Sequence, residues 1–386
     1  MFPTLSSLIN YLFGTSLDWS IPTFGFFVVL AFFLSFLVFR MEFKRKEKIG
    51  EIHAFYESQN GSIVQRVLIL LGYALFGFLF GFKGWAFLDK PDLLIREPFN
   101  FLLSSYGHWG WGIAIGISFV IMAIFIMSRE KRKSKGLVHL VHPYQLTPKM
   151  LLFCAVFGFI GSKLFNILED WDLHRNFSVL EILRFSGLTF YGGLIFGAIV
   201  YFIMGIRKKI PWRSLADIGA LGMLVAYGVG RLGCHFSGDG DWGIVNNNPK
   251  PFSWIPDHLW AFNFPHNVIQ QGIFIPGCVG KYCMVLPEAV FPTSAYESIF
   301  ILTAFFIFII FRNKLRTPGL IASIYFVIIG VERLLIEYIR VNYKFNVFGV
   351  WMSEAQIISV LLILLGIGLF IYISKFKSST SRYKKC

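Results

Sequence analysis

Charged residues are scarce in this sequence, and acidic residues are scarcer than basic ones. Charged side chains make up 15% of 386 residues, and 22 Asp and Glu stand against 36 Lys and Arg. Apolar residues reach 55%, Phe alone occurs 45 times, and the mean hydropathy is +0.63. A single soluble core of this chain length does not need so much apolar surface, so we predict an integral membrane protein.

Three further features are absent or rare. Residues 1–20 contain no Lys or Arg, so we expect no secretory signal peptide and a first apolar helix that acts as its own insertion signal. No internal repeat is evident, although many secondary transporters carry one. Only five cysteines occur, and the spacing of Cys278 and Cys283 leaves both a disulfide and two free thiols open.

Long apolar runs, in contrast, recur along the whole chain. A hydrocarbon core of about 30 Å takes about 20 residues of helix. We therefore predict an all-α, polytopic transmembrane helix bundle of about nine spans. The second and third spans contain almost no polar residues, so we interpret them as a peripheral addition. The expected spans are 21–39, 67–88, 112–127, 150–168, 185–206, 216–233, 296–311, 318–336 and 354–374.

The basic residues predict the orientation of these spans. Most Lys and Arg lie in alternate connecting segments, and cytoplasmic segments are the ones that carry such an excess. This places the N-terminus in the periplasm and the C-terminus in the cytoplasm. The net charge of +14 then reports topology and contact with anionic membrane lipids, and we expect no nucleic-acid partner, because no binding module accompanies the basic runs.

The same pattern divides the chain into six parts. They are a first span with a periplasmic N-terminal segment (1–42), an inserted region with two extra spans and basic cytoplasmic loops (43–149), core spans (150–233), a periplasmic cap loop (234–295), core spans with an Arg/Glu cluster (296–374) and a basic cytoplasmic tail (375–386).

Ionisable residues inside apolar runs point to function, because each costs roughly 2.5 to 3.5 kcal/mol at the centre of a membrane helix. Three of them follow one another at i, i+4 and i+7, which predicts one shared helix face. A buried ion-pair network that fixes helix register would also explain them. The residues are Lys163, Arg231, Glu297, Arg333, Glu337 and Arg340.

Most of these charges lie toward the outer ends of their predicted spans. A transporter or lipid flippase would favour charges at the midplane. An enzyme that acts on a phospholipid headgroup needs arginine at headgroup depth, because a guanidinium binds phosphate oxygens in pairs and stays charged in an apolar site. The depth therefore favours the enzyme.

Two glycine-rich segments accompany the charges. Gly192 and Gly193 lie within a predicted span, where glycine allows another helix or a lipid to approach the backbone, and helix packing is the commoner reason. Asp239 and Asp241 follow Arg231 in a loop that lacks the full spacing of a calcium site. We predict neither a metal nor a cofactor.

The segment Gly230-Arg231-Leu232-Gly233, followed by Asp241-Trp242-Gly243, resembles the signature of the prolipoprotein diacylglyceryl transferase family. Further matches cover about residues 184–360, with a weaker fit at Phe24-Gly25. They are Gly-Gly-Leu-Ile at 192–195, Ala216-Asp217, Pro292 to Glu297, Arg333 to Arg340, and Ser353, Gln356 and Ser359. Residues 43–149 have no counterpart in the simplest members of the family, so the resemblance implies a seven-span core to which the second and third spans are added.

Three departures from the family pattern concern proton transfer. Tyr191 stands where the family commonly has His, and Cys234 stands where it commonly has Asn. The acidic loop is one residue longer and contains His235. The resemblance leaves the proton acceptor open between Tyr191 and His235, and Tyr191 also suggests an inactive relative that binds lipid or lipoprotein.

The resemblance implies an enzyme of the bacterial inner membrane that carries out the first step of lipoprotein maturation. The diacylglyceryl group of phosphatidylglycerol would pass to the lipobox cysteine thiol of a prolipoprotein, with release of glycerol phosphate. Arg231 and Arg333 would hold the phosphate, Glu297 and Glu337 would orient the two guanidiniums, and Arg340 would complete the network. Gly192 and Gly193 would adjoin the substrate.

Overall fold

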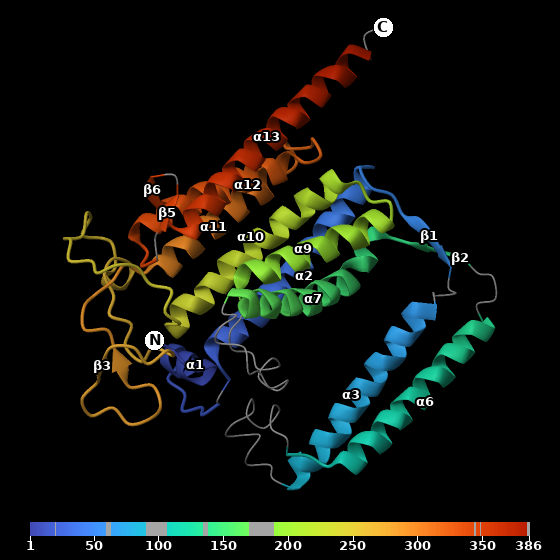
Figure 1. Ribbon diagram of the computed structural model, residues 1–386, viewed down its shortest axis with the longest axis horizontal. Coiled ribbons are helices and arrows are strands. Elements are labelled where there is room, and N and C mark those ends of the chain that lie inside the picture. Colours follow the sequence, from blue (N-terminus) through green and yellow to red (C-terminus); the bar gives the residue numbers. More distant parts are fainter. Residues whose placement is uncertain are drawn as a thin grey trace.

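The computed structural model describes the chain except for residues 20, 59–62, 90–105, 134–137, 170–188, 343–344, 348 and 384–386. In this part of the chain, eight helices are long and apolar enough to cross a membrane (Figure 1). This confirms the predicted all-α polytopic bundle. The helices are α2 (Thr23–Lys48), α3 (Ile63–Asp89), α6 (Trp109–Lys133), α7 (Thr147–Glu169), α9 (Phe190–Arg207), α10 (Trp212–Ser237), α11 (Thr293–Phe311) and α13 (Glu354–Tyr383).

The remaining expected span is α12 (Leu320–Ile336), which has 17 residues. At 1.5 Å per residue it is about 26 Å long, a little less than the hydrocarbon thickness of about 30 Å. A 3₁₀ turn, η3 (Glu337–Ile339), continues the chain directly from its end. The orientation of the bundle and the six-part division of the chain remain predictions.

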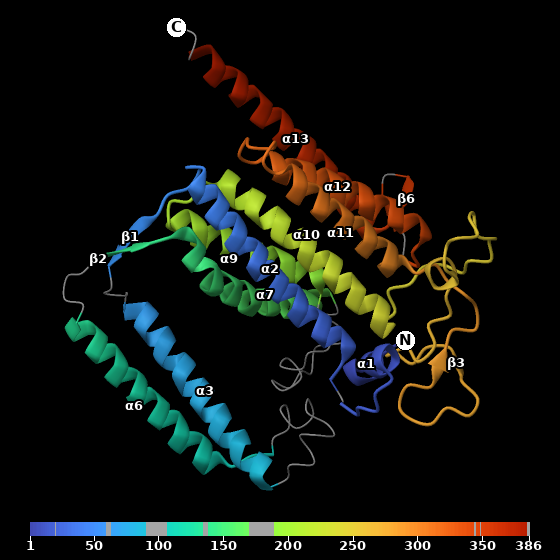
Figure 2. The same cartoon turned by 180° about the vertical axis from the view of Figure 1, so that it is seen from behind.

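Helix α10 lies at the centre of the bundle and packs on α2, α11 and α12 (Figures 1 and 2). In the 18-residue apolar stretch of α10, 61% of the residues are buried. The corresponding stretches of the other seven long helices are 11 to 44% buried. Leu221 and Leu224 of α10, Ile301 of α11 and Ile321 of α12 are fully buried in one hydrophobic cluster. The residues carried by α10 are therefore the ones most shielded from lipid.

One end of this core is tied together by Asp217, near the start of α10. Its carboxylate accepts hydrogen bonds from the backbone N–H groups of Gly319 and Ala322 at 2.9 and 3.0 Å, at the start of α12. It also pairs with Lys46 of α2 at 3.1 Å. Because a buried carboxylate is stable only with such partners, Asp217 links three helices at the end opposite Arg231.

Helices α3 and α6 pack on each other and stand beside the bundle in both views (Figures 1 and 2). The antiparallel strands β1 (Phe55–Ser58) and β2 (Val138–Val141) pair just before α3 and just after α6. Helices α3 and α6 therefore form a helical hairpin, and the β1–β2 pair brings the two ends of that hairpin together.

The chain between α10 and α11 forms a cap over one end of the core. It contains η2 (Asp257–Leu259) and the short strands β3 (Ile273–Phe274) and β4 (Met284–Val285). Its own hydrophobic cluster is built from Trp242, Phe264, Leu286 and Val290. Cys278 and Cys283 are joined in a disulfide. The short helix α1 (Leu5–Phe13), which we did not predict, lies beside the cap (Figure 2).

Candidate functional site

Glu297, in the first turns of α11, is the hub of an arginine cluster at the cap end of the core. Its side chain is 0% exposed. Arg333 and Arg340 each donate a hydrogen bond from Nη1 to Oε1, at 3.1 and 3.2 Å. Arg231 Nε lies 2.5 Å from Oε2 as an ion pair, although its N–H does not point at that oxygen. Three guanidiniums from separate parts of the chain therefore meet at one buried carboxylate.

Asp241, in the loop after α10, bridges two of these arginines. One carboxylate oxygen pairs with Arg231, and the other lies 2.5 Å from Arg340 Nη2. Burial by itself would raise the pKa of Asp241, but the charges of Arg231 and Arg340 outweigh burial and hold the pKa below its usual range. Asp241 is therefore an ionised partner of the cluster at neutral pH.

Glu337 links Arg333 to the start of α13. Its carboxylate lies 3.6 Å from Arg333 Nη2 and accepts hydrogen bonds from Asn342 and Ser353, both at 2.6 Å. Ser353 also exchanges backbone-to-side-chain hydrogen bonds with Gln356 at the start of α13, which is the geometry of a capping box. The end of α12 and the start of α13 are thus held at the same level.

The cluster has equal numbers of positive and negative groups, but these groups differ in how far they are exposed. Three guanidiniums face three carboxylates, those of Asp241, Glu297 and Glu337. The Arg231, Arg333 and Arg340 side chains keep 16, 18 and 11% exposure, whereas Glu297 and Glu337 have none. Asp241 is 30% exposed, so an incoming anion meets the guanidiniums and Asp241 before it meets the two buried glutamates.

The local backbone explains how Asp241 reaches Arg340. Gly240, with φ of 99°, takes a left-handed conformation that favours glycine and turns the chain back toward α10. At Gly243 an added side chain would collide with the carbonyl oxygen of Ile339, and Ile244 N–H donates to that oxygen at 2.8 Å. The loop is thereby docked on the residue that precedes Arg340.

One sequence prediction about this group needs correction. Arg333, Glu337 and Arg340 were expected on one helix face, but α12 ends at Ile336 and Arg340 is in an extended conformation after η3. Helical spacing accounts only for the Arg333 and Glu337 pair. Arg340 reaches the same site because the cap loop holds it there.

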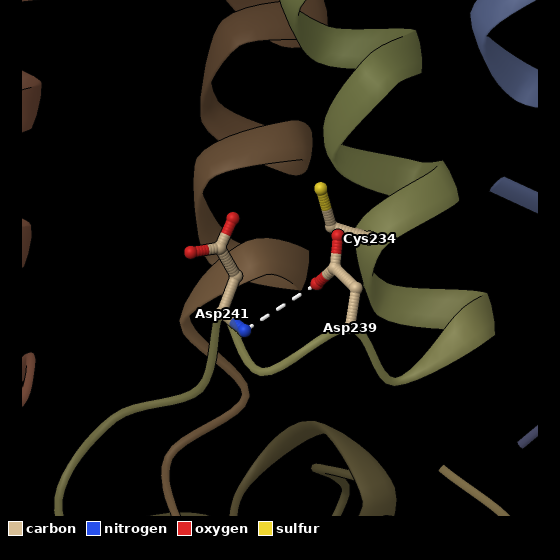
Figure 3. A group of neighbouring side chains, drawn as sticks. All are labelled: Cys234, Asp239 and Asp241. Atoms are coloured by element: carbon tan, nitrogen blue, oxygen red, sulfur yellow. Dashed lines mark hydrogen bonds between the residues drawn. The ribbon is translucent and has the colours of Figure 1, made fainter. Parts of the chain in front are cut away.

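Cys234, Asp239 and Asp241 gather closely enough to resemble a metal site (Figure 3). Their ligand atoms lie within 4.8 Å of one another. The Asp241 oxygens, however, face Arg231 and Arg340. Asp239 accepts a hydrogen bond from the backbone N–H of Asp241 at 3.3 Å, and the Cys234 sulfur lies 4.0 Å from Arg231 Nη1. These partners account for the arrangement, so it gives no reason to propose a cation.

The two candidate proton acceptors are in different surroundings. Tyr191, on the first turn of α9, lies close enough to Arg333 and Glu337 for their charges to act on its phenol. His235 is 7% exposed and packs among the rings of Phe236, Phe262 and Phe264. The structure brings Tyr191 to the arginine cluster and does not bring His235 there.

Gly192 and Gly193 lie where α9 crosses α7. An added side chain at Gly192 would collide with the Gly161 carbonyl oxygen, and one at Gly193 would lie 2.6 Å from Ser162 Oγ. These glycines allow the two helices to touch backbone to backbone. Lys163, the other intramembrane charge noted in the sequence, is buried on α7.

Two carboxylates of this region were not identified as site residues from the sequence. Asp241 was considered as a possible metal ligand and as part of the family signature, but no role in the site was predicted for it. Glu332, next to Arg333 on α12, was not considered at all, although it is an acidic residue in an apolar run. Its side chain is 3% exposed, and neither carboxylate oxygen has a hydrogen-bond partner in the described part of the chain.

Fold and site together define a multi-pass helical membrane protein with a buried arginine and carboxylate cluster at one end of its core. The model of the prolipoprotein diacylglyceryl transferase family matches residues 101–372, well over half of the chain, and the chain belongs to this family. The resemblance seen in the motifs is thereby confirmed.

Named relatives agree with this assignment. The chain is 26% identical over 284 residues to phosphatidylglycerol-prolipoprotein diacylglyceryl transferase 1 of Clostridium perfringens, which covers 73% of this chain and 96% of that protein. It is also 26% identical over 275 residues to the phosphatidylglycerol-prolipoprotein diacylglyceryl transferase of Streptococcus sanguinis. That match covers 69% of this chain and 92% of the relative. The corresponding Dehalococcoides mccartyi protein is 25% identical over 283 residues, with 72% and 93% covered.

Proposed function

We propose that this protein transfers the diacylglyceryl group of phosphatidylglycerol to the lipobox cysteine thiol of a prolipoprotein and releases glycerol phosphate. The observation that carries the proposal is the meeting of Arg231, Arg333 and Arg340 at Glu297. The names of the relatives supply the two substrates.

The arginine cluster suits a phosphate diester. A guanidinium has five N–H donors, and the exposure of Arg231 and Arg333 leaves room for an anion beside their carboxylate partners. Because Glu297, Asp241 and Glu337 already hold the guanidiniums in place, little reorganisation is needed when the phosphate binds. Such preorganised charges are the main source of transition-state stabilisation in many enzymes.

The reaction itself needs little covalent chemistry from the protein. The thiolate of the substrate cysteine attacks the glycerol carbon that bears the phosphate, so a sulfur–carbon bond forms as the carbon–oxygen bond breaks. The phosphate group leaves with one more negative charge than it had in the lipid. Arg231 and Arg333 are the groups placed to stabilise that charge. The nucleophile belongs to the substrate, so the enzyme needs no nucleophilic serine of its own.

Tyr191 is the better placed of the two candidate proton acceptors. Its phenol lies within electrostatic range of Arg333, so a thiol brought to the bound phosphate would also be near the phenol. His235 faces the aromatic side chains of the cap instead. Gly192, beside Tyr191, would contribute to the substrate site by letting α7 and α9 close behind that side chain.

The cellular setting follows from the expected orientation. With the N-terminus in the periplasm, the start of α2 and the end of α10 lie at the outer leaflet, and so does the arginine cluster. We therefore place the protein in the bacterial inner membrane, in contact with membrane lipids, phosphatidylglycerol and the lipobox segment of a prolipoprotein.

A mass measurement tests this function. Purified protein is incubated in phosphatidylglycerol micelles with a lipobox peptide, and the peptide is weighed. We expect the mass of one diacylglyceryl group to be added, and a loss of about 10² to 10³ in rate for Arg231→Ala and for Arg333→Ala. Arg316→Ala, an exposed arginine in the loop before α12, is the matched control. Lipid movement or lipid binding without any change in peptide mass would instead indicate a flippase or an inactive relative.

A further inference from the structure

Glu332 is the one acidic residue near the arginine cluster whose role is not explained by the contacts described above. It is buried on α12, and both of its carboxylate oxygens lack a hydrogen-bond partner within the described residues. Glu297 and Glu337, which are equally buried, each have arginine partners. A carboxyl group buried without a partner is rare, because its desolvation is not offset.

The groups that act on Glu332 come from every side of the cluster. Glu297 of α11, Arg333 of α12, Arg231 of α10 and Arg340 after η3 all lie within electrostatic range of its carboxylate, and so does Tyr227 of α10. Glu332 is therefore a buried residue within electrostatic range of all three guanidiniums.

Charge counting indicates which form of Glu332 is compatible with a bound phosphate. The three guanidiniums are already balanced by Asp241, Glu297 and Glu337. Asp239 adds a further carboxyl group within range of Arg231. An ionised Glu332 would therefore add negative charge to a cluster whose guanidiniums are already paired before a lipid phosphate arrives. Burial without a partner also disfavours the ionised form. A neutral carboxyl group adds no charge, and it has an O–H that can donate a hydrogen bond.

We propose that Glu332 acts as a neutral carboxylic acid and donates a hydrogen bond to the phosphate of the bound phosphatidylglycerol. This inference rests on the proposed function and adds a fourth phosphate ligand to the three arginines. It also makes lipid binding sensitive to pH. When Glu332 loses its proton, a donor is replaced by an anion that repels the phosphate, so affinity falls as the pH rises.

Two substitutions distinguish a neutral hydrogen-bond donor at Glu332 from a side chain that only fills space and from an ionised carboxylate. Glu332→Gln keeps the size and a hydrogen-bond donor but cannot ionise. Glu332→Met keeps the approximate size and loses the donor. Glu288→Gln makes the same chemical change at an exposed position in the cap and serves as the matched control.

The experiment measures binding of short-chain phosphatidylglycerol to the purified full-length protein in neutral detergent, from about pH 6 to about pH 10, the range that includes buried carboxyls with strongly raised pKa values. We expect wild type and Glu288→Gln to lose about tenfold or more in affinity toward high pH. Glu332→Gln should keep its affinity across that range. Glu332→Met should bind about tenfold more weakly at low pH, as the loss of a hydrogen bond to a charged group predicts. Thermal unfolding of each variant reports whether it is folded.

Contrary outcomes are distinct. If folded Glu332→Met binds like wild type with the same pH dependence, Glu332 only fills space and the inference is wrong. If Glu332→Gln binds weakly at every pH, an ionised carboxylate is required and the inference is also wrong. The lipobox peptide is weighed in parallel. Wild type that binds the lipid with the expected pH dependence but never modifies the peptide would overturn the function and leave the role of Glu332 standing.

Discussion

Asp241 and Arg340 are 99 residues apart in the sequence, yet Asp241 Oδ1 lies 2.5 Å from Arg340 Nη2. Asp241 follows α10 and Arg340 follows η3, so this contact closes the cap loop onto the end of α12. The backbone contact between Ile244 and Ile339 holds the same two segments together at 2.8 Å. The phosphate site therefore depends on a loop as much as on the helices.

Removing the charge of Asp241 should loosen that closure. In Asp241→Asn, Arg231 and Arg340 each lose an ionised partner, and we expect unfolding to become easier by about 2 kcal/mol, the range of a hydrogen bond to a charged group. Thermal unfolding in detergent measures the change. Asp239→Asn is the matched control, because Asp239 contacts neither arginine in an ion pair among the described residues. Equal destabilisation by the two variants would contradict the bridging role of Asp241.

The lowered pKa of Asp241 predicts an acid-sensitive contribution to stability. Its folded pKa lies below the unfolded value of about 3.9, so the stabilisation is complete above about pH 4 and is lost as the pH falls through the folded pKa. We expect the difference in unfolding temperature between wild type and Asp241→Asn to shrink below about pH 4. Unfolding followed from about pH 7 to about pH 3 tests this, and a difference that stays constant over the whole range would show that the Asp241 charge is not responsible.

The helices could be predicted from the sequence, but most contacts of the arginine cluster could not. Each membrane span needs a long apolar run, so hydropathy located the helices, although α2 and α13 continue to Lys48 and Tyr383, beyond the predicted ends at 39 and 374. Arg333 and Glu337 could be paired from helical spacing, because they lie four residues apart on α12. The position of Asp241 depends on the left-handed turn at Gly240 and on the docking of the cap loop, and the partners of Glu297 depend on how three helices pack. No local pattern encodes those tertiary contacts.

Tyr191 and His235 can be separated by single substitutions. Tyr191→Phe removes the hydroxyl that lies within electrostatic range of Arg333, and we expect transfer to fall by about 10² or more, the usual effect of losing a proton-transfer group. His235→Phe replaces the imidazole with a phenyl ring in an already aromatic environment, so transfer should remain within about threefold of wild type. The lipobox peptide assay measures both. Loss of transfer in folded His235→Phe with full activity in Tyr191→Phe would reverse the assignment.

The crossing of α7 and α9 makes Gly192 intolerant of a side chain. In Gly192→Ala the new methyl group would meet the backbone carbonyl of Gly161, which is part of a helix and cannot move without moving α7. We expect a loss of about 1 to 3 kcal/mol in stability, as for other overpacked sites, together with reduced transfer because Tyr191 is the neighbouring residue.

Gly197→Ala provides the comparison on the same helix. Its added methyl group would lie 3.5 Å from the Cys154 carbonyl oxygen, an ordinary contact distance, and alanine is the better helix former. We therefore expect Gly197→Ala to be as stable as wild type or slightly more stable, with transfer unchanged. Thermal unfolding and the peptide mass are measured for both variants. If α9 simply requires glycine at these positions, the two substitutions should be equally harmful. If close packing at Gly192 is the reason, only Gly192→Ala should be harmful.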